Sequence, residues 1–496
     1  MRKSTYLLFA IFLLAIVIRL YFAFQTPYFT NNDSYFHIRQ IEHIHDTGFP
    51  LYNDDLSYGG RKYLFLPMFH YFLAFFTLFM PILFAVKIVP AILAASTVLL
   101  VYLIVRKFTK KEEVAVLTAF ISAFIPIFFK ETINVISLYS LAIPLTLLLL
   151  YFFMDISSKG NAMLYVLVFI IFLFTKPTIM LIITSFIIYF IIIKIENLSL
   201  DKAEIEIVIF SLIFSLWFYL LIYKNAFYNH GYAFLWHNVP IKYFTDYFQQ
   251  VSILQAIYQI GIIPFLCGIY IISSFTLKKK DKIMYLFISV VITTTILMWF
   301  KLIELNLALI YLSFFLVMLF AKFLDILLEY ISQTKLNNYY NYIIGVILII
   351  LLFTSVIPSF KFADTNIKDA TKQDEVNTLL MLFATSLQDT TILGSVDDGH
   401  LITYFSNRKT VADDNFLLID NINERINDID EIFTTYSKIK ASELLDKYSI
   451  DYIFLSDNTK KQYGLSDLRF IDEKCFDSIN YYNVTVYKNK CKVTIG

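Results

Sequence analysis

Cysteine is scarce in this sequence, with three residues in 496. Three cysteines are too few for the disulfide framework that holds small secreted domains together. Cys267 lies in an apolar run and is expected to be a small buried thiol. Cys475 and Cys491 flank a predicted hairpin and can pair if their compartment is oxidising. The sequence alone leaves that pairing open.

Charged residues are scarce as well. Asp, Glu, Lys and Arg make up 16% of the chain, against about 25% in soluble domains. The formal net charge is +1, which gives no reason to expect a nucleic-acid partner. Hydrophobic residues instead reach 58%, with a mean hydropathy of +0.65. This composition predicts an integral membrane protein.

The N-terminus lacks a small-residue cleavage site after its apolar run MRKSTYLLFAIFLLAIVI, so we interpret it as a retained signal-anchor helix. Other runs are also long enough to cross the hydrocarbon layer, although several are short or contain proline. The expected spans are 4–24, 83–105, 114–129, 138–154, 162–176, 178–195, 205–223, 252–276, 284–300, 305–325 and 341–358. They predict a polytopic α-helical membrane domain of about eleven spans over residues 1–362.

Lys and Arg residues gather in alternate loops, and positively charged loops stay in the cytoplasm. The loops assigned to the cytoplasm contain Arg106, Lys107, Lys110, Lys111, Lys159, Lys194, Lys202, Lys278, Lys279, Lys280, Lys282 and Lys335. This pattern predicts a multi-pass protein of the cell membrane with a cytoplasmic N-terminus. Residues 63–80 are also apolar, but a span there would place Arg106 and Lys107 outside. We therefore expect 63–80 to be a half-buried helix within a first outer loop, 25–82. A second long outer loop is expected at 224–250.

The character of the chain changes after Pro358. Residues 363–496 hold a large share of the Asp, Glu and Lys residues. Strand-like runs (TILGSV, DYIFLS, NVTVYK) alternate with polar helical stretches (NERINDIDEIF, ASELLDKY). The region predicts a soluble α/β domain on the outer face of the membrane. No internal repeat and no low-complexity linker are apparent in the sequence.

The first outer loop contains the most informative stretch, NNDSYFHIRQIEHIHDTGFPLYNDDLSYGGRKY. A carboxylate such as Asp33 at the lipid–water boundary costs free energy unless it has a partner or a task. Asp33 can cap a helix that runs from Ser34 to His45, or it can bind a cation or act as a base. The three histidines of the loop do not share a helical metal-binding face, which argues against a zinc site.

Two motifs resemble a known family. NNDSYFHIR is similar to the acidic loop of the catalytic subunit of oligosaccharyltransferase. VDDGHLITYFSNRKTVADDNF is similar to that family's tryptophan-tryptophan-aspartate motif and the residues after it. The order of parts along the whole chain also resembles the family. The resemblance implies the C-type (GT-C) glycosyltransferase fold and a sugar donor linked through phosphate to a polyprenol, a membrane lipid.

The resemblance also implies a catalytic site. Asp33 takes the catalytic position in the acidic loop. The family's second acidic motif has two carboxylates one residue apart, whereas only Glu131 stands there, in FFKETINVISLYSLAIPL. The resemblance therefore implies catalytic roles for Asp33 and Glu131, which can both bind Mg²⁺ or Mn²⁺ through hard oxygen ligands.

Both tryptophans of the family motif are replaced, by Ser395 and Val396. The following Asp397, Asp398 and His400 either bind substrate or form a polar turn that caps a helix at 400–407.

Four further side chains are candidates for substrate binding. They are His37, Arg39, Arg61 and Lys301. The cationic ones can act as point charges toward a phosphate. Lys301 lies near an arginine position of the family, but a lysine at the end of a span also extends to the water boundary for its own solvation.

The leading interpretation is an integral-membrane glycosyltransferase. It would move a sugar or oligosaccharide from a polyprenyl-phosphate-linked donor to an acceptor on the outer face, which the sequence does not identify as protein, lipid or glycan. Two other classes stay open: a non-catalytic relative that binds lipid-linked glycan, and a transporter or flippase. The charges gather at span ends and no repeat is present, which argues against a transporter.

Overall fold

The computed structural model describes residues 2–244, 251–277, 280–481 and 483–491, so that Lys278 and Lys279 lie outside the described residues. The chain forms two compact units. The helical unit comprises Met1–Pro27, Leu66–Ile222 and Phe248–Lys368. The mixed unit comprises Tyr28–Phe65, Tyr223–Tyr247 and Asp369–Gly496. The mixed unit therefore combines the C-terminal stretch with two segments from earlier in the chain.

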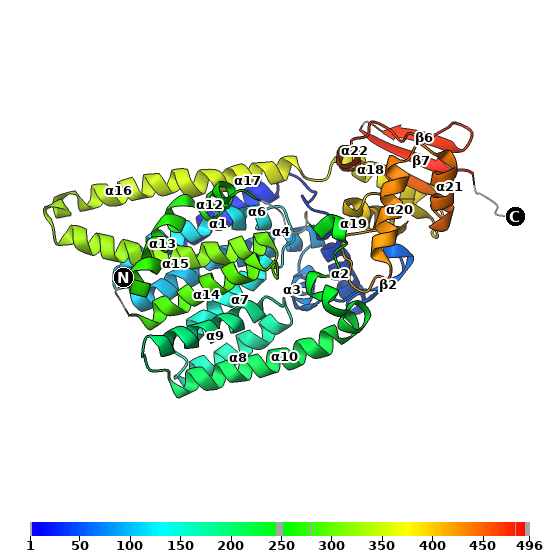
Figure 1. Ribbon diagram of the computed structural model, residues 1–496. Helices are drawn as coiled ribbons and strands as arrows, with labels where there is room; N and C mark the ends of the chain where they lie inside the picture. Colours follow the sequence, from blue (N-terminus) through cyan, green and yellow to red (C-terminus); the bar gives the residue numbers. More distant parts are fainter. Residues whose placement is uncertain (1, 245–250, 278–279, 482, 492–496) are drawn as a thin grey trace. The chain divides into compact units, whose positions relative to one another are not determined.

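The helical unit consists of apolar helices that run side by side (Figure 1). They are α1 (Arg2–Ala23), α3 (Met68–Thr77), α4 (Ile82–Phe108), α5 (Glu112–Ala123), α6 (Pro126–Thr132), α7 (Tyr139–Phe153), α8 (Lys159–Leu173), α9 (Ile179–Ile195), α10 (Lys202–His230), α12 (Ile253–Ile260), α13 (Ile262–Leu277), α14 (Lys282–Trp299), α15 (Leu305–Ser332), α16 (Tyr340–Leu351) and α17 (Ile357–Lys368). The last residues of α10, from Tyr223 on, belong to the mixed unit.

Every expected span coincides with one of these helices or with a pair of them. Within the described residues, six helices are long and apolar enough to cross a membrane, or up to eight if each of two bent pairs is one span. The bent pairs are α5 with α6 and α12 with α13. Helices of 15 to 17 residues supply the expected spans at α7, α8 and α9. The prediction of a polytopic α-helical membrane protein is confirmed. Helices suit this environment because they satisfy their backbone hydrogen bonds internally.

Polar contacts join the loops that the charge pattern assigns to the cytoplasm. These contacts are Ser4 to Glu112, Tyr340 to Glu113, Thr109 to Asp325, Lys107 to Asp155, and Lys282 to Glu204. Their distances lie between 2.5 and 3.1 Å. The loops rich in Lys and Arg therefore meet at one end of the helical unit, as a consistent topology requires.

The end of α1 lies beside the start of α4. The Lys87 ammonium of α4 donates to the carbonyl oxygens of Ala23 and Thr26, each at 2.5 Å. These bonds satisfy carbonyl groups that have no partner within α1. The intervening α3 has ten residues, which span about 15 Å, half of the hydrocarbon thickness. A short α3 between these two helix ends fits the expectation that residues 63–80 do not cross the membrane.

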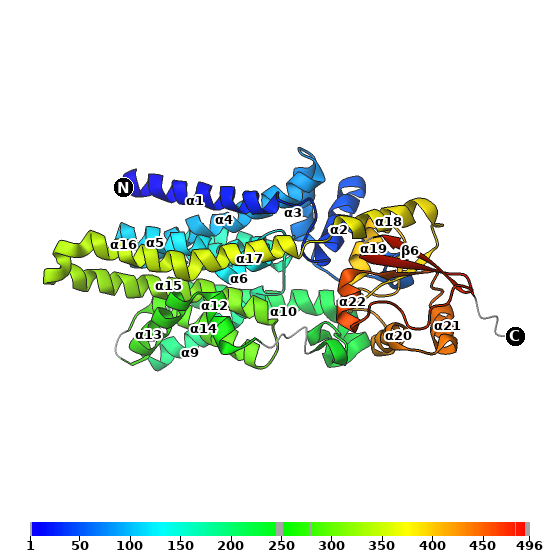
Figure 2. The ribbon, with the colours of Figure 1, turned by 90° about the horizontal axis from the view of Figure 1, so that it is seen from above.

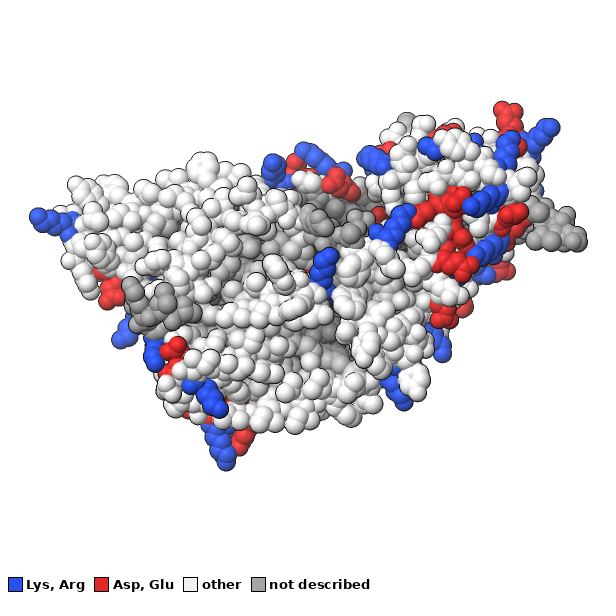
Figure 3. Space-filling model, in the orientation of Figure 1, with Lys and Arg blue, Asp and Glu red and all other residues white. Residues whose placement is uncertain are grey.

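Charged side chains of the helical unit gather at its ends. Between its ends, the face of the helical unit seen in Figure 3 carries almost no Lys, Arg, Asp or Glu. Many large apolar side chains on this unit are exposed, such as Trp217, Leu220 and Phe353, at 56%, 72% and 65%. Lipid is the solvent that accepts such a surface, since exposed apolar patches of this extent do not occur on soluble monomers.

The mixed unit contains a five-stranded sheet with the order β4-β3-β5-β7-β6. The strands are β3 (Thr391–Leu393), β4 (Lys409–Thr410), β5 (Tyr452–Leu455), β6 (Phe476–Tyr481) and β7 (Val484–Asn489). β3 pairs in parallel with both β4 and β5, and β7 is antiparallel to β5 and β6. The three strand-like runs of the sequence correspond to β3, β5 and β7.

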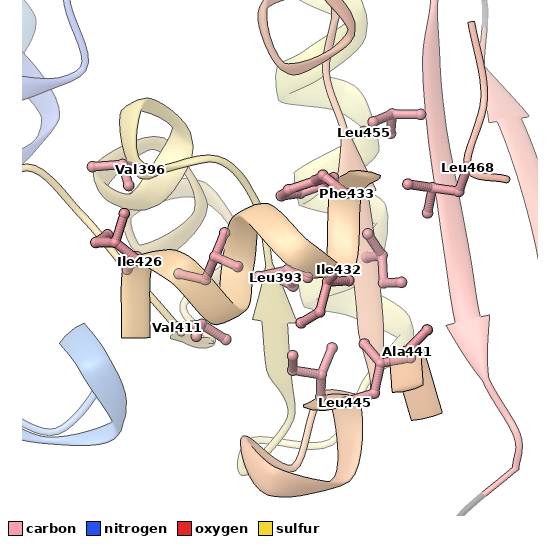
Figure 4. Close-up of a cluster of buried hydrophobic side chains, with 14 of the residues drawn as sticks. Leu393, Val396, Val411, Ile426, Ile432, Phe433, Ala441, Leu445, Leu455 and Leu468 are labelled. Carbon is pink, nitrogen blue, oxygen red and sulfur yellow. The ribbon is translucent and has the colours of Figure 1, made fainter. Parts of the chain in front are cut away.

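Helices and a small hairpin surround this sheet (Figures 1 and 2). They are α2 (Asp33–Thr47), α18 (Gln373–Thr385), α19 (Gly399–Ser406), α20 (Ile422–Thr434), α21 (Lys438–Lys447), α22 (Asp457–Tyr463) and the hairpin of β1 (Asn53–Asp54) with β2 (Arg61–Lys62). The core packs Leu393 and Leu455 of the sheet against Ile432 and Phe433 of α20 and Leu445 of α21 (Figure 4). The predicted soluble α/β domain is confirmed.

Cys475 and Cys491 form a disulfide bond at the base of the β6–β7 hairpin. The bond closes the two hairpin ends, where the Lys490 N–H also donates to the Cys475 carbonyl oxygen at 2.8 Å. A structural disulfide is typical of an oxidising compartment.

Cysteine labelling tests the predicted orientation. In a Cys267→Ser background, Lys280→Cys is expected to react with a membrane-impermeant maleimide only after the inner face is made accessible. Lys62→Cys, exposed on the β1–β2 hairpin, is expected to react in intact cells. The reverse pattern would invert the topology that the Lys and Arg residues predict.

Candidate metal centre

Three side chains of the mixed unit converge in a cluster that can hold a metal ion. They are Asp33, His400 and Asp414, and one ligand atom from each lies within 4.8 Å of the others. Atoms bound to one ion through bonds of about 2.0–2.2 Å lie roughly 3–4 Å apart. Small side-chain movements therefore suffice for all three residues to bind a common cation.

The parallel pairing of β3 with β4 brings two of these residues together. His400 follows β3 and Asp414 follows β4, and neighbouring parallel strands end at the same edge of a sheet. Gly399 allows the close approach of the two segments. A Cβ atom at this position would overlap the carbonyl oxygen of Ala412 and the side chain of Asp413. The glycine before His400 is therefore required by packing.

The third residue, Asp33, comes from α2, which packs against α19. The rings of Tyr35 and Tyr404 stack with centroids 5.5 Å apart, and Phe36 lies 5.3 Å from the His400 ring. The Asn32 side chain donates to the backbone carbonyl of Asp397. These contacts join the two motifs that resemble the oligosaccharyltransferase family.

Asp33 is the first residue of α2. The N-cap position belongs to Asn32, which makes no side-chain capping bond. The alternative in which Asp33 serves as the N-cap of this helix is therefore wrong. Its carboxylate is one of the three groups that converge in the cluster.

His400 and Asp414 lie in direct contact within the cluster. His400 Nε2 lies 2.9 Å from Asp414 Oδ1. Nevertheless, this oxygen is buried and makes no hydrogen bond within the described part of the chain, and the same holds for His400 Nδ1. A buried oxygen without a hydrogen bond is costly. A cation between the carboxylate and the imidazole would satisfy it.

Negative charge dominates the electrostatics of the cluster. Burial lowers the pKa of His400, but the charges of Asp413, Asp414 and Asp33 outweigh burial and raise it above its usual value. Burial raises the pKa of Asp414, but the neighbouring imidazole outweighs burial and lowers it. Both directions show that the site favours positive charge, whether a proton or a metal ion supplies it.

A buried ion pair next to Asp414 supports the cluster. Arg61 Nη2 lies 3.0 Å from Asp413 Oδ1, with the two side chains 3% and 0% exposed. Asp413 also accepts from the Ser57 hydroxyl and from the Asn415 N–H, and Tyr58 donates to its carbonyl oxygen at 2.8 Å. The loop after β4 is thereby tied to the β1–β2 hairpin, which fixes the position of the adjacent Asp414.

The remaining candidates of the first outer loop have partners of their own. Arg39 binds both carboxylate oxygens of Asp54, at 2.8 and 2.9 Å. Burial raises the pKa of Asp54, but the Arg39 guanidinium outweighs it and lowers the pKa below its usual range. His37 is buried, with its ring 5.4 Å from that of Phe36. Substrate binding by Arg39, Arg61 and His37 remains a prediction, and the observed bonds show that Arg39 and Arg61 also stabilise the unit.

Asp398 is buried in the mixed unit. Its Oδ2 atom accepts hydrogen bonds from the hydroxyls of Ser395, Ser456 and Thr459, at 2.9, 2.8 and 2.6 Å. Burial raises its pKa despite these bonds. Asp398 thus links the turn before α19 to the start of α22, whereas Asp397 contributes its backbone carbonyl to Asn32. Their roles in binding substrate remain predictions.

The helical unit carries the other candidates at the end opposite to the loops rich in Lys and Arg. Glu131 accepts from the Asn306 amide at 2.9 Å, and Lys130 lies 3.6 Å away. Tyr139 donates to Glu304 at 3.1 Å. Lys301 is exposed after α14, with a left-handed φ of 53°. Asp33 and Glu131 belong to different units, so a metal ion shared between them remains a prediction.

Asp413 and Asp414 were not selected from the sequence, although both lie in the quoted motif VADDNF. A signal for them was available. TIL and KT form the neighbouring strands β3 and β4, and polar residues that follow neighbouring parallel strands meet at one sheet edge. The pairing of these strands was the missing information, since KT alone is too short to be recognised as a strand.

Comparisons with known proteins were made by sequence and by structure. No protein-family model and no curated protein matches the sequence. By structure, the chain is similar to the oligosaccharyltransferase AglB from Archaeoglobus fulgidus in complex with an inhibitory peptide and a dolichol-phosphate. The TM-score is 0.68 at 13% identity, over 98% of this chain and 74% of that chain.

Two other solved structures are similar. One is the Archaeoglobus fulgidus oligosaccharyltransferase in complex with Zn and sulfate, with a TM-score of 0.62 at 14% identity, over 97% of this chain and 73% of that chain. The other is ArnT from Cupriavidus metallidurans bound to undecaprenyl phosphate. Its TM-score is 0.54 at 10% identity, over 99% of this chain and 98% of that chain.

These similarities define the class of fold. The chain shares its fold with these solved structures, and this is the GT-C fold that the resemblance of the two sequence motifs implied. At 10–14% identity it is a divergent example of that fold.

Loss of the Arg61 charge tests how the cluster is supported. Arg61→Met is expected to destabilise the mixed unit by about 3–5 kcal/mol, because it leaves the buried Asp413 carboxylate without its counter-ion. Lys409→Met is the control, since it removes a pair with Asp389, whose side chain is 95% exposed, and is expected to cost below about 1 kcal/mol. Thermal unfolding in detergent measures both. Equal stability of the two variants would mean that the ion pair does not support the site.

Proposed function

We propose that this chain is an integral-membrane glycosyltransferase that moves a sugar from a polyprenyl-phosphate-linked donor to an acceptor on the outer face. One observation carries the proposal: Asp33 of the first motif converges with His400 and Asp414 of the second in a chain with the GT-C fold. The structures to which it is similar include one with a dolichol-phosphate and one with undecaprenyl phosphate.

The chemistry of such a transfer sets what the site must supply. The bond between the anomeric carbon and the phosphate oxygen breaks, and an acceptor oxygen or nitrogen forms a new bond to that carbon. Positive charge develops on the sugar ring, negative charge grows on the leaving phosphate, and the acceptor loses a proton. The site therefore needs a carboxylate near the acceptor and positive charge near the phosphate.

The residues of the cluster fit a divalent cation. Two carboxylates and one imidazole suit Mn²⁺ or Zn²⁺ better than Mg²⁺, which prefers an all-oxygen shell. A cation held by Asp33, His400 and Asp414 would supply positive charge to the leaving phosphate. Asp413 and Arg61 position this ligand set through their buried ion pair. Within this proposal, Glu131 stays a second catalytic candidate, and Lys301 a candidate for the donor phosphate.

The lipid donor also explains why the candidate residues stand at helix ends and in loops. A polyprenyl chain dissolves in hydrocarbon, whereas its phosphate stays at the water boundary. Groups that act on the phosphate must therefore lie just outside the membrane. In the proposed topology, the N-terminus is cytoplasmic and the mixed unit is outside, in agreement with its disulfide bond.

Asp33→Asn is expected to reduce release of sugar from a panel of polyprenyl-phosphate-linked donors by at least about 100-fold, because it removes the charge but keeps the size of the side chain. Asp55→Asn, which changes an exposed carboxylate of the same loop, is expected to leave the rate unchanged. Near wild-type turnover by folded Asp33→Asn protein would exclude Asp33 from the chemistry.

Removal of metal provides an independent test. Treatment of the purified protein with a chelator is expected to abolish sugar release, and Mn²⁺ or Zn²⁺ is expected to restore it more completely than Mg²⁺. The His400→Ala variant is expected to need much more metal for the same recovery. Full activity in protein shown by elemental analysis to be free of metal would contradict the proposed role of the cluster.

A further inference from the structure

The mixed unit contains a cavity formed by residues other than those of the Asp33, His400 and Asp414 cluster. Its volume is about 650 Å³, within the usual range for ligand sites of about 300–1,000 Å³. It is lined by Asn229, His230 and Asn238 on one side and by residues 419–424 on the other. Seven of these nine residues are Asn, Asp, Glu or His, and none of them was selected from the sequence.

The side chains of His230 and Asn238 bind the backbone beside one wall of the cavity, and this backbone is strained. Leu418 and Asn421 have left-handed φ angles of 62° and 53°. His230 Nε2 accepts from the Leu418 N–H at 3.1 Å, and the Asn238 amide donates to the Phe416 carbonyl oxygen at 3.1 Å. A left-handed leucine costs about 1–3 kcal/mol, and such strain clusters at ligand sites. The wall is thus fixed before any ligand arrives.

Several polar groups of the cavity remain available. Asn421 occupies the N-cap position of α20, but its side chain makes no capping bond. Within the described residues, the side chains of Asn229 and Asn421 have no hydrogen-bond partner. Asp420 is exposed, and Glu424 accepts from Lys447 at 2.7 Å. The cavity therefore offers both hydrogen-bond donors and acceptors.

The residues that line the cavity exclude several classes of ligand. The charge of Asp420 repels a phosphate or another anion, whereas Glu424 is paired with Lys447. The two apolar residues of the lining, Ile419 and Ile422, are 6% and 3% exposed, so they offer no surface to a lipid chain or to the apolar side chains of a peptide. Side-chain amides both donate and accept hydrogen bonds, as hydroxyl groups do. A neutral ligand rich in hydroxyl groups matches this wall.

We propose that this cavity binds a neutral saccharide. This binding does not depend on the proposed glycosyltransferase function, so the two proposals can fail separately.

Saturation-transfer NMR tests the binding. The full-length protein is purified in a sugar-free zwitterionic detergent, because maltoside and glucoside detergents would compete for the cavity. The probes are maltose, cellobiose, mannobiose and chitobiose, with a neutral polar tetrapeptide as the non-saccharide comparison. The test variant is Asn229→Ala combined with Asn421→Gly, in which glycine keeps the left-handed backbone and removes the amide. The control is Asn427→Ala, an exposed asparagine further along α20.

At least one disaccharide is expected to bind the wild type and Asn427→Ala equally, and to bind the double variant at least about tenfold more weakly, equivalent to roughly 1.4 kcal/mol. Binding that is unchanged in the double variant would overturn the proposal. Failure of every disaccharide to bind, or binding of the tetrapeptide alone, would also overturn it. Sugar release by the wild type and by Asp33→Asn, measured without any saccharide on the same preparations, reports separately on the glycosyltransferase proposal.

Discussion

The candidate site depends on one buried ion pair, between Arg61 and Asp413. The guanidinium comes from a two-residue strand in the first outer loop, and the carboxylate comes from a loop more than 350 residues later in the chain. Neither group tolerates burial alone, because a charge without a partner is far more costly than a paired one. Each segment is therefore held against the other. Asp414, the next residue, is brought to His400 by the same constraint.

The residues that support the candidate site differ from those that would bind its ligand. Arg61, Asp413, Ser57 and Tyr58 bind one another within the unit. Asp33, His400 and Asp414 converge and leave a buried oxygen of Asp414 without a hydrogen bond. A buried oxygen without a partner, inside a group of side chains that can bind a metal, is typical of a ligand site. The negative balance of the cluster indicates that this ligand is a cation.

The membrane spans and the α/β domain were predictable from the sequence because hydropathy and period are local properties. A run of about 20 apolar residues predicts a membrane span by itself. The composition of TIL, DYIFLS and NVTVYK likewise predicts strands. That residues 63–80 do not cross the membrane stays a prediction, because it rests on the Lys and Arg residues of later loops.

The metal cluster was only half predictable. Asp33 and His400 were selected because their motifs resemble a known family, but their meeting depends on the packing of α2 on α19. The partners of Arg39 and Asp398 were not predictable either, since Asp54 lies 15 residues away on β1 and Ser456 lies 58 residues away. Tertiary structure brings such partners together, and a local sequence pattern does not predict which residues will meet.

The central claim is that a cation binds where these three side chains meet. Crystals of the full-length protein soaked in Mn²⁺ test it most directly, through an anomalous difference map. The account predicts a peak at bonding distance, about 2.0–2.2 Å, from Asp33, His400 and Asp414. A peak bonded only to Glu131 in the helical unit, or no peak at the cluster in fully soaked crystals, would contradict it.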